Sequence, residues 1–230
     1  MRTLQLAIKW IVDRVLAAIG LVVLAPVFAA IWVWVRRDAG TPVFITQLRA
    51  GKDGTPFRLL KVRSMVPNAV QVGQELGITD DPFGVVAEDP RITKSGRVLR
   101  RTGLDELPQL VNILRGEMSV VGPRPDLVEQ VANYTKADRR RLAVRPGLTG
   151  WSQTHGREEI GWPERIEQDV WYIDHWSLWL DLKIVALTFA QLFRSDPEPV
   201  EDTMNIERAR TVAEGAPTDG AAADRTDAGE

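Results

Sequence analysis

An uncharged apolar run from Val15 to Val35 is the most prominent hydrophobic pattern in the chain. About 20 apolar residues in a helix span the hydrocarbon core of a bilayer, so the run predicts a membrane segment. A secretory signal peptide is the first alternative. Against it, the run is longer than the usual signal core, and no convincing small-residue cleavage site follows.

Positive residues flank this run on both sides. They are Arg2, Lys9 and Arg14 before it, and Arg36, Arg37, Arg49 and Lys52 after it. Because positive residues beside a membrane segment tend to stay cytoplasmic, both ends are expected on that side. Pro26, in the middle of the run, removes a helical hydrogen bond and bends the axis. Together these features favour a re-entrant membrane helix over residues 1–37 that bends at Pro26, with a plain spanning helix as the alternative.

Tryptophan is concentrated in the last part of the chain before residue 196, where five of the eight lie between Trp151 and Trp179. The stretch from residue 164 onward mixes tryptophan with charged residues and becomes apolar around Ile184 to Phe193. Tryptophan favours the headgroup region of a membrane, so the pattern predicts one or two amphipathic helices at the interface. An ordinary aromatic core helix is the alternative.

Two further elements are predicted in the middle of the chain. Residues 43–47 and 57–62 are rich in strand formers and are separated by the turn signal Lys52-Asp53-Gly54, which predicts a β-hairpin. Leucine and valine recur at helical spacing over residues 107–114, and Gly116 is a natural helix end. The second pattern predicts a helix that begins near Asp105 and Glu106.

Composition limits the available chemistry. The chain is 44% hydrophobic and 26% charged, as in an average globular protein, and it has no cysteine and only two histidines. Thiol nucleophiles, disulfides and thiolate metal sites are excluded, so catalysis would depend on carboxylates, Lys/Arg, hydroxyls or an oxygen-bound metal. Residues 196–230 contain ten acidic and three basic side chains and are predicted to be a disordered acidic tail, which leaves the preceding part net basic.

The adjacent acids Asp105 and Glu106 lie in the densest stretch of the sequence. An acidic pair at a helix start is ordinarily a capping arrangement. Here several basic residues precede the pair, and Arg124 follows the helix between two prolines that stiffen its loop. Ionised carboxylates among phosphate-binding arginines suit phosphoryl transfer through an acyl-phosphate, with Mg²⁺ held by the carboxylates and the substrate phosphates.

A glycine-rich segment over residues 145–157, RPGLTGWSQTHGR, carries Arg145 in a series of tight turns. Such a segment contacts phosphate or nucleotide in many proteins, and it also occurs as a plain surface loop.

At these residues the chain resembles the bacterial sugar transferase family, the small monotopic polyprenyl-phosphate phosphoglycosyl transferases. The resemblance covers roughly residues 4–195 and rests on KVRSM, DPRITKSGRVLRRTGLDELPQLVNILRGEMSVVGPRP, RPGLTGW and DVWYIDHWSLWLDLKIV, in the family's order. It implies a helix-rich α/β fold with a re-entrant membrane helix, a small catalytic domain with interfacial helices over residues 38–195, and a place at the cytoplasmic face of the bacterial inner membrane. Pro26 matches the family's helix-breaking proline, whereas Ala25 stands where the family often has a capping serine.

The resemblance also implies roles for individual residues. Asp105 would attack the β-phosphorus of a UDP-sugar, release UMP and hold the sugar phosphate until polyprenyl (undecaprenyl) phosphate takes it. Glu106 would assist through Mg²⁺ or a proton. Phosphate or nucleotide binding is implied for Arg124 and Arg145, with Lys61, Arg63 and Arg91 as additional candidates. The product would start a bacterial glycan pathway, with downstream glycosyltransferases as further partners.

Three other functions compete with this interpretation. A hydrolase with the same acyl-phosphate chemistry would consume the nucleotide sugar without lipid. A membrane scaffold would not need the acidic pair or Arg124, and both are present. Nucleic-acid binding is disfavoured because the tryptophans accompany apolar helix residues and the net charge is −2.

Overall fold

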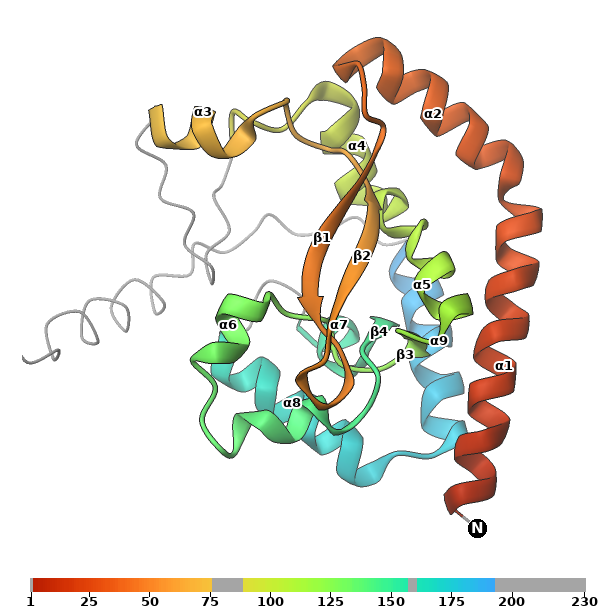
Figure 1. The fold of residues 1–230 in the computed structure, drawn as a ribbon. Coiled ribbons are helices and arrows are strands. Elements are labelled where there is room, and N and C mark those ends of the chain that lie inside the picture. The colour runs from red at the N-terminus through yellow and green to blue at the C-terminus, as the bar shows by residue number, and fades with distance from the viewer. Residues whose placement is uncertain (1, 76–88, 157–160, 193–230) are drawn as a thin grey trace, which may run out of the picture.

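Two small sheets lie within a shell of helices in the computed structural model, which describes residues 2–75, 89–156 and 161–192 (Figure 1). This arrangement confirms the predicted helix-rich α/β class and its short antiparallel hairpin. The predicted acidic tail lies outside the described residues, as do residues 76–88 between the hairpin and the acidic pair.

The first two helices form a bent pair. Helix α1 spans Arg2–Val23 and helix α2 spans Ala25–Ala39, with a 60° bend between them. The break falls at Leu24, two residues before the predicted bend at Pro26, because a proline in the first turn of a new helix loses no helical hydrogen bond. Within the described residues no single helix is long and apolar enough to cross a membrane, whereas the bent pair meets that condition as a unit.

The predicted hairpin follows. Strand β1, Phe44–Ala50, pairs antiparallel with strand β2, Pro56–Val62, so that Phe44 lies opposite Val62 and Ala50 opposite Pro56. The 3₁₀ turn η1, Lys52–Gly54, joins them, and Asp53 and Gly54 adopt the positive φ angles of a tight turn. The turn signal in the sequence therefore predicted the connection correctly.

The remaining elements are short until the last two helices. The helices are α3 (Ala69–Glu75), α4 (Lys94–Thr102), η2 (Leu104–Glu106), α5 (Gln109–Arg115), α6 (Val128–Ala132), η3 (Asp138–Ala143), α7 (Trp151–Thr154), α8 (Trp162–His175) and α9 (Leu178–Leu192). A parallel pair that the sequence did not predict, β3 (Ser119–Val121) and β4 (Gly147–Thr149), brings two distant loops together. The tryptophan-rich segment forms two long helices, α8 and α9.

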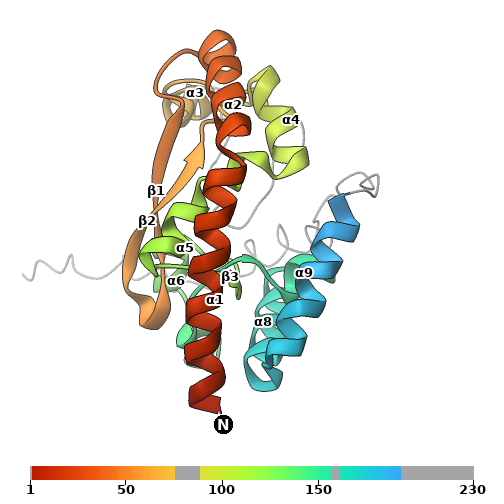
Figure 2. The same ribbon diagram turned by 90° about the vertical axis from the view of Figure 1, so that its right-hand side faces the viewer.

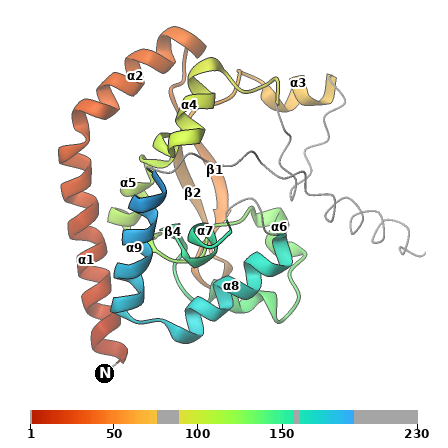
Figure 3. The same ribbon diagram turned by 180° about the vertical axis from the view of Figure 1, so that it is seen from behind.

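Helix α1 packs against the body of the protein from Lys9 onward, whereas residues 3–8 are exposed. Ala17 contacts a buried cluster that includes Leu110 and Ile113 of α5 and Phe57 of β2. Figure 2 shows α1 with α5 and the hairpin on one side and α8 and α9 on the other, and Figure 3 shows α9 beside α1 with α7 and α8 beyond it. Helix α2 contributes Ile31 and Val35 to a second cluster, which packs against Leu104 beside the acidic pair. Both helices of the bent pair are therefore packed against the body of the protein.

The outward side of the bent pair is apolar. Val22 and Val23 are 76% and 66% exposed, and Trp179 on α9 is 75% exposed. Large apolar side chains exposed along a helix pair are typical of a surface that contacts a partner or a membrane.

Candidate active site

The acidic pair occupies a tight turn between two helices. Helix α4 ends at Gly103, whose φ of 68° is left-handed, and Asp105 and Glu106 then form the 3₁₀ turn η2. Helix α5 begins at Gln109, three residues later than the sequence predicted, because the chain makes this single 3₁₀ turn before the α-helix starts. The turn places two adjacent carboxylates at one end of α5.

Glu106 is paired with the arginine of the Gly-Pro-Arg-Pro loop. Its Oε1 lies 2.7 Å from Nη2 of Arg124, which donates a hydrogen bond to it. Burial acts to raise the pKa of Glu106, but the charge and hydrogen bond of Arg124 outweigh it and the pKa is lowered. Glu106 is therefore held as a carboxylate, and its second oxygen takes no hydrogen bond within the described residues.

Asp105 is in a different environment. It is only 4% exposed, it accepts no hydrogen bond from the described residues, and its Oδ2 lies 3.6 Å from Nζ of Lys61 on β2. Burial raises the pKa of Asp105 although Lys61 opposes the shift, and burial also lowers the pKa of Lys61 although Asp105 opposes that shift. The single ammonium of Lys61 only partly offsets the cost of burying the Asp105 charge. A further cation, or a bond formed by one of its free oxygens, would stabilise this carboxylate.

The acidic pair is suited to a divalent cation for which the substrate supplies some of the ligands. Among the described residues no three His, Cys, Asp or Glu side chains are grouped to form a cage of protein ligands. Asp105 and Glu106 are adjacent and keep oxygens free, which is the donor set that Mg²⁺ uses when substrate phosphates and water complete its shell. The two residues predicted to bind Mg²⁺ are thus suited to it.

Positive charge converges on the same place. Arg49 of β1 is mostly buried, and burial together with the nearby charge of Arg124 lowers the pKa of Arg49 to about 10. Arg100 adds a further charge beside Asp105, while its Nε donates to Ser64 Oγ at 2.9 Å. Two carboxylates surrounded by several cations form a site that attracts the phosphates of a substrate.

The loop that carries Arg124 is fixed by its carbonyl groups, because its two prolines have no N–H to donate. Each of four successive carbonyls accepts a hydrogen bond from elsewhere in the fold. The donor–acceptor pairs are Gly147 N to Pro123 O at 2.8 Å, Arg141 Nη2 to Arg124 O at 3.1 Å, Arg49 Nη1 to Pro125 O at 3.2 Å and Ala50 N to Asp126 O at 2.9 Å. Arg124 therefore extends from a rigid loop.

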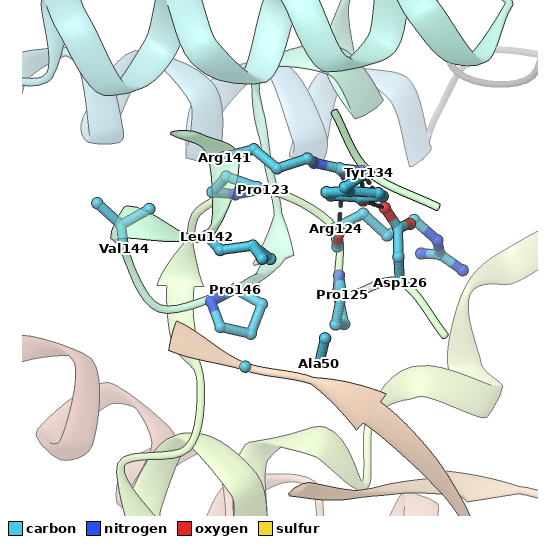
Figure 4. A pocket seen from close by; sticks show the side chains of 11 residues that line it. Ala50, Pro123, Arg124, Pro125, Asp126, Tyr134, Arg141, Leu142, Val144 and Pro146 are labelled. Carbon is cyan, nitrogen blue, oxygen red and sulfur yellow. Dashed lines mark hydrogen bonds and ion pairs between the residues drawn. The ribbon is translucent and has the colours of Figure 1, made fainter. Parts of the chain in front are cut away.

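Arg141 lies behind this loop and is almost fully buried. Figure 4 shows it with Tyr134 and Asp126 around a small pocket, while the guanidinium of Arg124 points away from that pocket. Arg141 pairs with Asp126 and with Asp169, the latter at 2.6 Å. No pattern in the sequence indicates this network, because its members come from separate loops and helices.

Asn112 is a second residue that sequence reasoning missed. It is fully buried in α5, where its Oδ1 accepts from Leu60 N at 3.0 Å and its Nδ2 donates to Arg58 O at 2.8 Å. Asn112 thereby holds the strand next to Lys61 against the helix that follows Asp105. Asn112 lies outside the predicted apolar stripe of residues 107–114, whose Leu114 is 42% exposed, so the pattern of the sequence did not indicate it.

Three of the expected phosphate binders have other partners. Arg63 donates to Thr41 O at 2.9 Å and to Ala39 O, and so caps the end of α2. Arg91 donates to both oxygens of Asp89, and Arg145 donates its Nε to Gly116 O at 2.8 Å at the far end of α5. Of the predicted binding residues, the structure brings Arg124 and Lys61 to the acidic pair, whereas the other three join none of its ion pairs.

The chain matches a known protein family over most of its length. The family described as bacterial sugar transferase matches residues 4–195. The chain is 41% identical over 181 residues to the uncharacterized sugar transferase EpsL of Bacillus subtilis, covering 79% of this chain and 84% of that protein.

Two longer relatives carry more specific names. The chain is 42% identical over 186 residues to the UDP-glucose:undecaprenyl-phosphate glucose-1-phosphate transferase of Escherichia coli, covering 76% of this chain and 38% of that protein. It is 38% identical over 192 residues to the undecaprenyl-phosphate galactose phosphotransferase of Salmonella typhimurium, covering 80% and 40%. The chain thus spans about two fifths of the length of these two relatives and most of EpsL.

Proposed function

The chain belongs to the bacterial sugar transferase family, and from that premise we propose that it transfers a sugar-1-phosphate from a UDP-sugar to a polyprenyl phosphate and releases UMP. The names of two relatives support both substrate classes, since each includes undecaprenyl phosphate and one includes UDP-glucose. The observation that carries the proposal is the buried, under-compensated carboxylate of Asp105 beside Glu106, Arg124 and Lys61.

Asp105 is the proposed nucleophile. One of its oxygens forms a bond to the β-phosphorus of the UDP-sugar, the bond from that phosphorus to the bridging oxygen breaks, and UMP leaves with the electron pair. An oxygen of the polyprenyl phosphate then attacks the same phosphorus, and the Asp105 carboxylate is released unchanged. Its lack of hydrogen bonds and its burial favour attack, because few solvent or protein contacts must be broken first.

The neighbours of Asp105 have complementary roles. Lys61 holds the carboxylate in its charged form before attack, and Arg124 binds the phosphate oxygens through a rigid two-pronged guanidinium. Glu106 orients Arg124. Asp105 and Glu106 would hold Mg²⁺, which would supply Lewis-acid stabilisation of the charge on the phosphates.

The membrane placement is part of the proposal. The apolar outward face of the bent pair and the exposed apolar residues of α9 support a re-entrant α1–α2 segment with α8 and α9 at the interface. With positive residues beyond both ends of the apolar run, the catalytic part lies at the cytoplasmic face of the bacterial inner membrane. There the polyprenyl product would pass to downstream glycosyltransferases.

Release of UMP tests the reaction. Purified full-length protein with Mg²⁺ is incubated with a panel of UDP-sugars, with and without undecaprenyl phosphate, beside the Asp105→Asn variant. We expect lipid-dependent release with one or a few sugars, and none from the variant. Equal release without lipid would show a hydrolase instead, and silence across the panel would reject the UDP-sugar assignment.

A further inference from the structure

Two arginines meet at the end of α5 that is remote from the acidic pair. Nε of Arg145 donates to Gly116 O at 2.8 Å, and the guanidinium of Arg14, from α1, lies against the α-carbon of the same glycine, where any β-carbon would overlap its Nη2. Gly116 tolerates this because it has no side chain, and its φ of 83° is itself left-handed. The seven residues of α5, about 10 Å of helix, separate this pair from the catalytic turn.

Neither arginine has an acidic partner among the described residues. Asp13, the neighbour of Arg14 in the chain, instead accepts a hydrogen bond from Ser119 at 2.6 Å and lies 3.6 Å from Lys9. Toward the part of the chain that the structure describes, Arg145 donates only through Nε, which leaves its four Nη hydrogens for another acceptor, and Arg14 donates one bond, to Trp10 O. Two partly buried cations held at one glycine form a position that an anion would stabilise.

The position of Arg14 along α1 indicates which anion reaches it. Arg14 is the last charged residue before the apolar run, and the next residues on the helix, Val15 and Leu16, are about half exposed. Its guanidinium stacks on Trp10, 3.6 Å from the ring centroid, and Trp10 is itself exposed. Tryptophan and arginine at the boundary of an apolar helix surface mark the headgroup layer, where phosphate esters of lipids are concentrated.

We infer that Arg14 and Arg145 form a binding site for the phosphate group of an anionic lipid, separate from the Asp105 cluster. Arg14 is contributed by the proposed membrane helix and Arg145 by the glycine-rich loop after η3, so an occupied site would tie the two together at the bilayer surface. The phosphate could belong to a phospholipid or to polyprenyl phosphate, since the same two guanidinium groups suit both. The inference rests on the proposed membrane placement and does not depend on the proposed reaction.

Lipid retention tests the site. The full-length protein in a neutral detergent is titrated with phosphatidylglycerol, undecaprenyl phosphate or phosphatidylcholine, and bound lipids are counted by native mass spectrometry. The variants are Arg14→Gln/Arg145→Gln, the two single changes and Arg14→Lys/Arg145→Lys. The control, Lys136→Gln/Arg139→Gln, removes the same charge from exposed residues near α6, on the opposite side of the molecule from α1 (Figure 1).

We expect the double glutamine variant to lose one anionic lipid, with an apparent Kd raised about tenfold. The lysine variant should show an intermediate loss because it keeps the charge but not the two-pronged geometry, and the control should bind like the unmodified protein. Loss confined to phosphatidylglycerol would identify a resident phospholipid, and loss confined to undecaprenyl phosphate would identify a docking site for the acceptor.

Retention of both anionic lipids equal to that of the control would overturn the inference. Retention is counted without nucleotide sugar, so the result can be read even if the proposed transfer reaction fails. Should the double glutamine variant not fold, the two single changes and the lysine variant give the same comparison.

Discussion

Replacing Arg141 tests, through the stability of the protein, whether buried ion pairs hold the loop that carries Arg124. Its side chain is 1% exposed and pairs with Asp169, which is equally buried, and with Asp126, while also donating to Arg124 O. In Arg141→Met a side chain of similar length remains, but the charge is gone. Removing one partner of a buried ion pair costs roughly 3–5 kcal/mol, because the other charge stays buried without compensation.

Thermal unfolding in detergent or nanodiscs measures this cost. For a protein of this size each kcal/mol lowers Tm by roughly 2–4 °C, so we expect a fall of roughly 6–20 °C. The neighbouring change Arg140→Met is the matched control. Arg140 is 57% exposed and pairs with the exposed Asp174 at 2.7 Å, and such surface pairs contribute about 0–1 kcal/mol.

The effect should also depend on pH. Burial raises the pKa of Asp169, and Arg141 partly offsets that shift, so the folded pKa rises further when Arg141 is removed. A carboxyl group whose folded pKa exceeds its unfolded value of about 3.9 stabilises the fold below that value and loses the contribution as pH rises through the folded pKa. The Tm deficit of Arg141→Met should therefore be larger at pH 8 than at pH 5, and Asp169→Asn in the same chain should recover part of it. A deficit no larger than that of Arg140→Met, or one that ignores pH, would refute the reasoning.

Three further predictions concern the site and its supports. Asn112→Ala leaves buried backbone groups of β2 unpaired and should cost roughly 3 kcal/mol in thermal unfolding, whereas the exposed Asn133→Ala should cost little; equal costs would contradict the role given to Asn112. Arg124→Lys should raise KM for the UDP-sugar at least about tenfold, because the two-pronged contact with phosphate is lost. The control Arg63→Lys should lower Tm and leave KM unchanged, because Arg63 caps α2. A raised KM in Arg63→Lys would show that capping α2 is not the only role of Arg63. Chelation by EDTA should abolish UMP release and Mg²⁺ should restore it, and full activity in EDTA would exclude the metal.

Local patterns in the sequence predicted the local structure well. The apolar helical run, the turn at Asp53-Gly54 and the helix before Gly116 each appear as expected, because each depends on the spacing of neighbouring residues. The buried face of α5 was wrong, since Leu114 is exposed and Asn112 and Ile113 are buried instead. The break between α1 and α2 lies two residues before Pro26, and α5 begins three residues after the predicted start. Both helix boundaries depend on how a single turn of backbone is capped.

Some functional residues could be predicted from local sequence patterns, and others could not. Asp105, Glu106 and Arg124 could be proposed from motif and spacing, and the structure brings them together with Lys61. Arg63 and Arg124 look equally suited to bind phosphate in the sequence, and only the structure distinguishes them. Arg63 donates to the backbone carbonyls of Thr41 and Ala39, so it has no role at the acidic pair. The buried network of Arg141 could not be predicted, because it joins residues up to 28 positions apart through packing alone.

The covalent step is the central claim, and intact-protein mass spectrometry tests it most directly. Full-length protein is incubated with Mg²⁺ and each UDP-sugar in the absence of acceptor, then with undecaprenyl phosphate. We expect a mass increase of one sugar phosphate on the unmodified chain, loss of that adduct when the acceptor is added, and no adduct on Asp105→Asn. An adduct that persists on Asp105→Asn, or lipid-dependent UMP release from the unmodified chain with no adduct under any condition, would contradict the account.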